Sequence, residues 1–177
     1  MGKFQRIRLL ICSLVGSHVF PRWKKEPIDN NSALFRNVHF NDVSKSDRMP
    51  APAAFKDCEL SCNWNKYSTP QHTRELISKQ YRLGTREFKD SNKYYVCSLS
   101  VSTINNLNIS QIILHDPSQL FPRVVGFPNN RSHSLVKGEK ENNISEKSKV
   151  KIREILARNS KWEIFDESLW KIQRQIK

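Results

Sequence analysis

Alternation of apolar and polar residues along the chain predicts several short β-strands. The clearest run covers 94–101, where one face of the strand would carry Tyr95, Cys97 and Leu99. Aromatic and β-branched residues favour strands, and successive side chains of a strand point to opposite faces. We therefore expect 94–101 to be a central strand. Similar patterns predict further strands over 33–40, 53–55, 60–64, 109–115, 123–127 and 134–136.

Helices are predicted where a capping residue precedes apolar residues at helical spacing. Thr69 caps a helix over about 70–81, and Pro70 occupies its first position, where no backbone N–H is needed. Ser145 caps an amphipathic helix that extends to about Ser160. A short helical turn through Asn106 precedes the strand over 109–115. Strands with helices inserted between them and a helical C-terminus predict an α+β fold with a small mixed or antiparallel sheet.

The length of the chain, 177 residues, fits one ordinary domain. Changes in composition divide it into three parts. Residues 1–32 are expected to be an N-terminal extension, 33–162 a single α+β domain, and 163–177 a C-terminal helix or tail.

The extension contains an apolar run from Leu9 to Phe20 behind basic residues, which is the layout of a secretory signal. No cleavage site with small residues follows it, and a bilayer span needs about 20 residues. We therefore expect no membrane span and a cytoplasmic location. A first element packed on the domain, or an upstream extension, explains this run better than export does.

A strongly basic balance favours contact with polyanions. Thirty Lys and Arg residues face 17 Asp and Glu residues, so the formal net charge is +13. Nucleic acid, an acidic protein and an anionic membrane surface all fit this charge. The basic residues are spread along the chain without a run of five, which is also the pattern of an ordinary solvated surface.

Cofactor and metal sites find little support in the sequence. Only five glycines are present, and neither a phosphate-binding glycine loop nor an internal repeat occurs, so no cofactor is predicted. The cysteines are too scattered for a disulfide framework, and we expect reduced thiols. A zinc site could be drawn from Cys58, Cys62, Cys97 and His115, but Cys97 lies in a strand pattern that favours the core. We therefore predict no metal.

Two clusters of polar residues are candidates for chemistry. His115 stands at a strand end beside Asp116, which suits a general base, although Asp-Pro also favours a simple turn. Strand alternation would place Arg131, His133 and Lys137 on one face, where Arg and Lys could hold a phosphate and His could relay a proton. Alternatively, Arg131 pairs with an acid and His133 packs.

A third group lies near the first predicted strand. Arg36 and His39 could contribute to a phosphate or nucleic-acid site together with Tyr67 and Ser68 at the helix start. The sequence does not show whether these segments meet.

Several blocks of the sequence carry a resemblance to known proteins: Leu34-Phe35-Arg36-Asn37-Val38-His39, Ala53-Ala54-Phe55-Lys56-Asp57, Leu60-Ser61 with Trp64, Lys66-Tyr67-Ser68-Thr69-Pro70, His115-Asp116-Pro117 and Asn130-Arg131-Ser132-His133. On these blocks the chain resembles a widespread group of small uncharacterised bacterial proteins over about 33–162. The resemblance implies no particular activity, cofactor or catalytic residue. Cys58 and Cys62 stand where that group commonly has other residues, which argues further against zinc.

Three functions follow as hypotheses. The first is a small basic accessory or binding protein that associates with nucleic acid or with a nucleic-acid-processing partner. The second is a metal-independent enzyme acting on a phosphodiester or nucleotide, with His115 and His133 as proton-transfer residues. The third is a toxin–antitoxin or defence-locus subunit that binds a protein partner.

Overall fold

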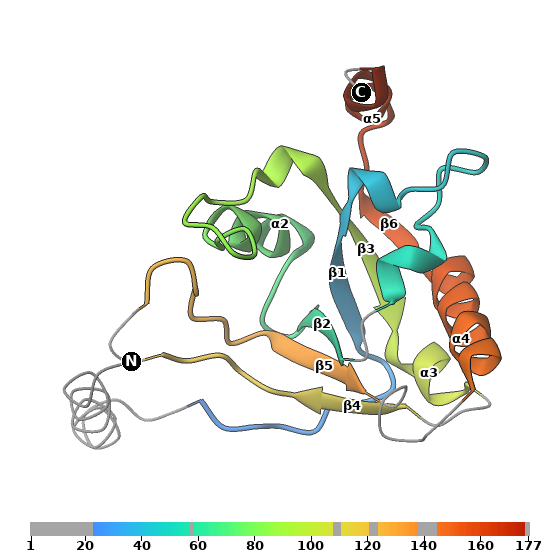
Figure 1. Ribbon diagram of the computed structural model, residues 1–177. Coiled ribbons are helices and arrows are strands. Elements are labelled where there is room, and N and C mark those ends of the chain that lie inside the picture. The colour runs from blue at the N-terminus through green and yellow to red at the C-terminus, as the bar shows by residue number, and fades with distance from the viewer. Residues whose placement is uncertain (1–22, 57–58, 108–110, 121–123, 138–144, 176–177) are drawn as a thin grey trace.

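The computed structural model describes residues 23–56, 59–107, 111–120, 124–137 and 145–175 (Figure 1). Its centre is a six-stranded sheet with the order β4-β5-β2-β1-β3-β6, and every pair of neighbouring strands is antiparallel. The predicted α+β fold, with an antiparallel sheet in a single domain, is confirmed. The strands are β1 (Ala33–His39), β2 (Glu59–Trp64), β3 (Tyr94–Ser100), β4 (Ile112–His115), β5 (His133–Lys137) and β6 (Lys161–Ile164).

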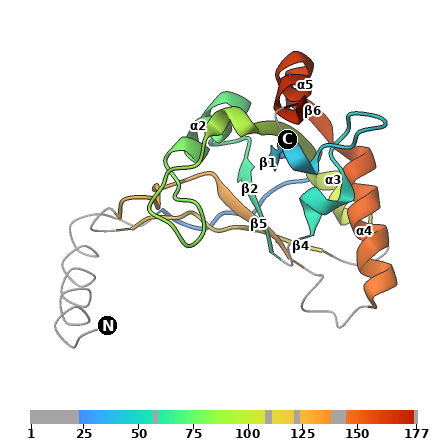
Figure 2. The same cartoon turned by 45° about the horizontal axis from the view of Figure 1, so that its top comes forward.

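Helices cover both faces of this sheet (Figure 1, Figure 2). On one side α2 (Pro70–Ser78) buries Thr73, Leu76 and Ile77. On the other side lie α3 (Val101–Asn105) and α4 (Glu146–Asn159), while α5 (Glu167–Gln175) follows β6. Three 3-10 helices complete the described secondary structure: η1 (Phe40–Asp42), η2 (Pro52–Phe55) and η3 (Ser91–Lys93).

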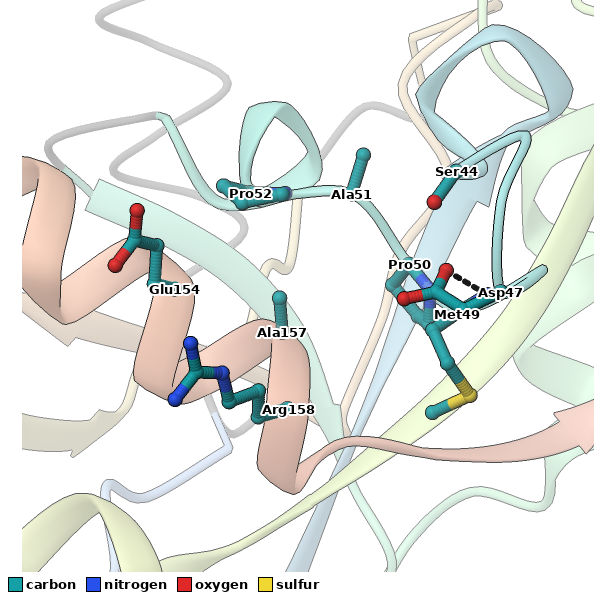
Figure 3. Close-up of a pocket in the computed structure, with 9 residues that line it drawn as sticks. All are labelled: Ser44, Asp47, Met49, Pro50, Ala51, Pro52, Glu154, Ala157 and Arg158. Atoms are coloured by element: carbon teal, nitrogen blue, oxygen red, sulfur yellow. Dashed lines mark hydrogen bonds between the residues drawn. The ribbon is translucent and has the colours of Figure 1, made fainter.

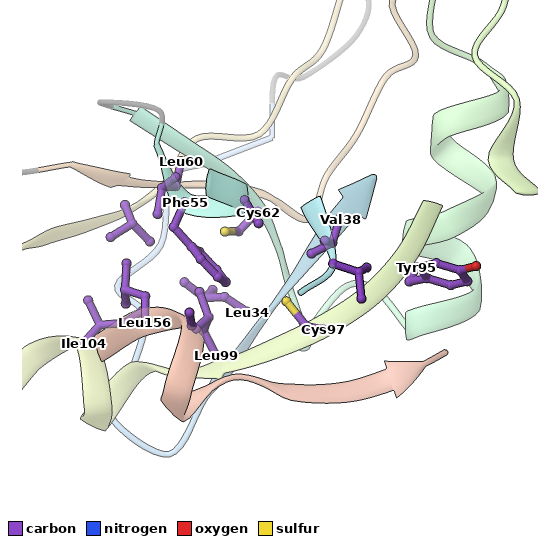
Figure 4. Close-up of a cluster of buried hydrophobic side chains, with 14 of the residues drawn as sticks. Leu34, Val38, Phe55, Leu60, Cys62, Tyr95, Cys97, Leu99, Ile104 and Leu156 are labelled. Atoms are coloured by element: carbon purple, nitrogen blue, oxygen red, sulfur yellow. The ribbon is translucent and has the colours of Figure 1, made fainter. Parts of the chain in front are cut away.

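The hydrophobic core lies between the sheet and the layer formed by η2, α3 and α4 (Figure 4). Strand alternation sends Leu34 and Val38 of β1 into this core, where they stand beside Leu99 and Tyr95 of β3. Burial of such side chains contributes roughly 1.5–3 kcal/mol each. The core therefore fixes which face of β1 and β2 is left for polar groups.

The predicted helix starts are confirmed by their capping bonds. The side chain of Thr69 accepts a hydrogen bond from the backbone N–H of His72, and Pro70 is the first residue of α2. Ser145 accepts from the N–H of Ser148 at the start of α4. These contacts satisfy backbone donors that the first turn of a helix leaves unpaired.

Three predicted elements are wrong in type. Residues 53–55, expected as a strand, form most of η2, where Pro52 begins a tight turn that buries Phe55. The strand predicted over 123–127 is a turn in its described part, closed by a bridge between Val124 and Phe127. The residues after Ser160 were expected as helix or tail, but they first form β6, which pairs with β3.

The described part of the predicted extension, residues 23–32, lies against the sheet. The backbone N–H of Trp23 donates to Gln119, Lys25 pairs with Asp116 at 2.6 Å, and Ile28 packs on the core. At the other end, β6 spans the expected boundary at residue 162. The apolar run over 9–20 lies outside the described residues. None of the described helices has the length and apolar composition needed to cross a bilayer.

Candidate functional site

A polar cleft opens where β1 and β2 separate. The two strands pair only at Leu34 with Trp64 and at Phe35 with Asn63, and beyond these pairs their backbones diverge. A cavity of about 330 Å³ lies at the divergence, and we call it the β1–β2 cleft. Residues from β1, β2 and β5 and from the segments around η2 and α2 line it. Its polar lining includes Arg36, Asn37, His39, Asp42, Lys56, Ser61, Asn63, Gln80, Lys89, Tyr94, Asn130 and His133.

His133 and Ser61 form a hydrogen bond within this cleft. Ser61 Oγ lies 3.0 Å from His133 Nε2, and Asp116 O lies 2.7 Å from His133 Nδ1. A carbonyl oxygen can only accept, so Nδ1 carries the hydrogen in the neutral ring and Nε2 presents its lone pair to the serine. The imidazole is thereby held in the tautomer that can take a proton from Ser61.

The turn before β5 is held by buried amides. Asn130 Nδ2 donates to Asn63 Oδ1 at 2.6 Å, and Ser132 Oγ lies within 3.1 Å of the same oxygen. The backbone N–H of Ser132 donates in turn to Asn130 Oδ1. Because buried polar groups that are fully paired rigidify their surroundings, this network fixes the backbone from which His133 projects.

The buried guanidinium of Arg36 spans the gap between the two strands. Its Nε donates to the carbonyl oxygen of Ala54 at 2.8 Å, and its Nη1 donates to the carbonyl oxygen of Ser61 at 3.1 Å. A positive charge therefore lies next to the backbone of the serine.

Two lysines add to the positive lining of the cleft. Lys89 donates to Gln80 at 3.0 Å, and burial lowers the pKa of Lys89 below its ordinary value. Lys56 is exposed just after η2. Among the described lining residues, Asp42 is the one carboxylate. Cations thus outnumber anions in this cleft, which suits an anionic ligand.

His39 reaches the same cleft from the end of β1. Its Nδ1 accepts a hydrogen bond from the N–H of Asn41, and its ring meets Tyr94 edge to face at 5.1 Å. Of the six predicted site residues, the structure brings together Arg36, His39 and His133.

His115 lies apart from this group, in the interior. It is 3% exposed, its Nε2 donates to the carbonyl oxygen of Arg131 at 2.7 Å, and its Nδ1 accepts from the N–H of Glu26 at 3.2 Å. The ring also stacks on Tyr67 and meets Trp64 edge to face. Both ring nitrogens are therefore engaged in holding three segments together.

The predicted cationic row of Arg131, His133 and Lys137 does not form one site. The Arg131 guanidinium lies 4.1 Å from the centre of the Tyr67 ring, outside the cleft lining. Lys137 pairs with Glu59 at 3.0 Å, at the other end of β5. Alternation does place His133 and Lys137 on one face, but they act in different surroundings.

Cys62 and Cys97 are buried in the core. Burial raises the pKa of Cys62 to about 11 and that of Cys97 to about 12, so both stay protonated thiols at neutral pH. A metal binds the thiolate, so these two positions are poor ligands. No cluster of potential metal ligands occurs within the described residues. Cys58, the third cysteine of the zinc drawing, lies outside them, as does Cys12.

Two other cavities differ in character from the cleft. One, of about 320 Å³, lies between the loop over 44–52 and α4, where Asp47 accepts from the N–H of Met49 (Figure 3). The second, of about 590 Å³, is bordered by apolar side chains such as Phe88, Val125 and Phe127. Neither combines a histidine with several cations, as the β1–β2 cleft does.

Sequence analysis does not single out Ser61, Asn63 or Lys89. One signal for the first two is present, since polar residues alternate with apolar ones along β2 and predict a polar face. Nothing in the sequence shows that this face meets His133. Comparisons with protein-family models, curated proteins and solved structures gave no match.

Proposed function

We propose that the β1–β2 cleft binds the phosphate groups of a nucleic acid, and that the chain is a small basic nucleic-acid-binding protein. The observation that carries this proposal is the gathering of Arg36, Lys56 and Lys89 around one cavity with Asp42 as the single described carboxylate. Phosphate oxygens are recognised by such cationic donors, and arginine and lysine serve differently, as a fork and as a point charge.

The overall charge supports the same ligand class. A net charge of +13 raises the local concentration of a polyanion and speeds its encounter with the cleft. Tyr94 and His39 at the rim supply ring faces on which an unpaired base could stack. A single strand is therefore a better fit to this cleft than a duplex.

The test is fluorescence anisotropy with labelled single-stranded RNA and DNA at low and moderate salt. We expect binding that weakens with salt, and the variant K56A/K89A should bind more weakly with a salt slope reduced by about 1 per lost phosphate contact. The matched control is K147A/K151A, which removes two exposed lysines of α4 outside the cleft lining.

The two double variants carry the same formal charge, 13 − 2 = +11. If both lose affinity equally, binding is a property of the general field and the cleft assignment is wrong. If the wild-type protein binds neither RNA nor DNA at low salt, the proposed function is wrong.

A further inference from the structure

We propose that Ser61 is a nucleophile, activated by His133, that attacks the phosphorus of a phosphate ester held in the β1–β2 cleft. This inference rests on the proposed function, because the same cleft would present the phosphate. It adds a reaction, a nucleophile and a base to what would otherwise be a binding site.

The first support is the order of the three groups. Asp116 O, His133 and Ser61 Oγ form a chain with steps of 2.7 and 3.0 Å. A nucleophile next to a base that a third group orients is the arrangement by which hydroxyl groups are activated in enzymes. Here a backbone carbonyl does the orienting, and it leaves Nε2 as the atom that accepts the proton.

The second support is the rigidity of the frame. Ser61 and His133 lie on neighbouring interior strands, whose register pairs Ser61 with Leu135 and Asn63 with His133. The serine and histidine are thus diagonal neighbours on one face of the sheet, within reach of each other without a flexible loop. Groups positioned by strands need little reorganisation to react.

The third support is the access and charge around the hydroxyl. Ser61 is exposed and lines the cavity, so a ligand can approach its Oγ. The Arg36 guanidinium donates to the carbonyl oxygen of Ser61 itself, and Lys89 lines the same cavity. These cations would stabilise the negative charge that phosphoryl oxygens carry and redistribute during the displacement.

The reaction balances with the groups at hand and water. Ser61 Oγ bonds to phosphorus as the bond from phosphorus to the leaving oxygen breaks, and the hydroxyl proton moves to His133 Nε2 and then to the leaving oxygen. Water next attacks the phosphoserine while His133 takes its proton. The bond between Oγ and phosphorus breaks, Oγ recovers a proton from His133, and the ester has been hydrolysed to an alcohol and a phosphate.

Two probes test this reaction. Diisopropyl fluorophosphate should form one adduct on Ser61 as fluoride leaves, detected by mass spectrometry of the digested protein. Bis(4-nitrophenyl) phosphate should release nitrophenol. We expect both signals to vanish in Ser61→Ala and to fall by about 100-fold or more in His133→Ala, the typical contribution of a general base.

Matched controls are available outside the cleft. Ser98→Ala removes a strand serine whose hydroxyl donates to Glu163, and His72→Ala removes a histidine that contacts Ser68. Both should label and turn over like the wild type. Circular dichroism confirms that each variant is folded.

The outcomes separate this inference from the proposed function. If the wild type binds oligonucleotides but neither reacts with the fluorophosphate nor releases nitrophenol, the nucleophile is refuted and the binding function stands. An adduct that persists in Ser61→Ala also refutes it. If oligonucleotide binding is absent as well, both proposals fail.

Discussion

Arg36 Nε donates a hydrogen bond to the carbonyl oxygen of Ala54 at 2.8 Å, so a charged group on a central strand holds the 3-10 helix that covers the core. The same guanidinium binds the carbonyl oxygen of Ser61 on β2. One side chain therefore links β1, β2 and η2 at the point where the two strands separate. The cleft exists because this polar link replaces the backbone pairing that β1 and β2 give up there.

Replacing Arg36 should cost stability. Arg36→Met leaves two carbonyl oxygens without these donors, and we expect the free energy of unfolding to fall by about 2–4 kcal/mol. Arg36→Lys should lie between, because an ammonium cannot reproduce the planar fork. Urea denaturation measures both. The control Arg158→Met, at an exposed position on α4, should stay within about 0.5 kcal/mol of the wild type. Equal losses in Arg36→Met and Arg158→Met would contradict the linking role.

His115 should prove to be a stabilising residue. His115→Phe keeps an aromatic ring beside Tyr67 but leaves the carbonyl oxygen of Arg131 and the N–H of Glu26 unpaired. We expect a loss of about 1–3 kcal/mol in thermal or urea unfolding. The folded variant should hydrolyse bis(4-nitrophenyl) phosphate at the rate of the wild type. A loss of hydrolysis without a loss of stability would instead support the earlier hypothesis that His115 transfers protons.

The contact between residues 23–32 and the sheet should weaken in acid. Hydrogen bonds from Lys66 and Tyr67 hold the pKa of Glu26 below its ordinary value of 4.5, and a hydrogen bond from Lys25 lowers the pKa of Asp116 below 3.8. Groups with lowered folded pKa values stabilise the fold above their ordinary values, and this stabilisation is lost as pH falls through the folded ones.

The measurement is unfolding of the wild type and of the variant E26Q/D116N between pH 7 and pH 2. The wild type should be more stable at neutral pH, and the two curves should converge below about pH 4. Glu75→Gln, at an exposed position on α2, serves as control. A stability difference that stays constant over the whole range would show that these carboxylates do not hold the segment by charge.

The buried thiols should resist alkylation. With a pKa of about 11, roughly one Cys62 side chain in a thousand is a thiolate at pH 8, against roughly a quarter of an ordinary cysteine. Iodoacetamide should therefore leave Cys62 and Cys97 unmodified in the folded protein and modify both in denaturant. Peptide mass spectrometry follows each site separately. Rapid modification of either residue in the folded chain would mean that the core around it opens.

Local structure was largely predictable because it depends on short-range physics. The strand over 94–101 follows from alternation, and the starts of α2 and α4 follow from Thr69 and Ser145, whose side chains satisfy the first backbone donors of each helix. Predictions failed where a short apolar stretch was ambiguous. Residues 53–55 are apolar enough for a strand, but Pro52 and the contact with Arg36 favour a 3-10 turn.

The site was only partly predictable because it depends on pairing between distant strands. The sequence by itself determined an α+β fold, a basic surface and a set of polar residues that included Arg36, His39 and His133. Only the tertiary structure decided that Ser61 meets His133, 72 positions away, and that His115 is consumed by the core. Strand order and register set which side chains become diagonal neighbours, and no local pattern along the chain encodes that choice.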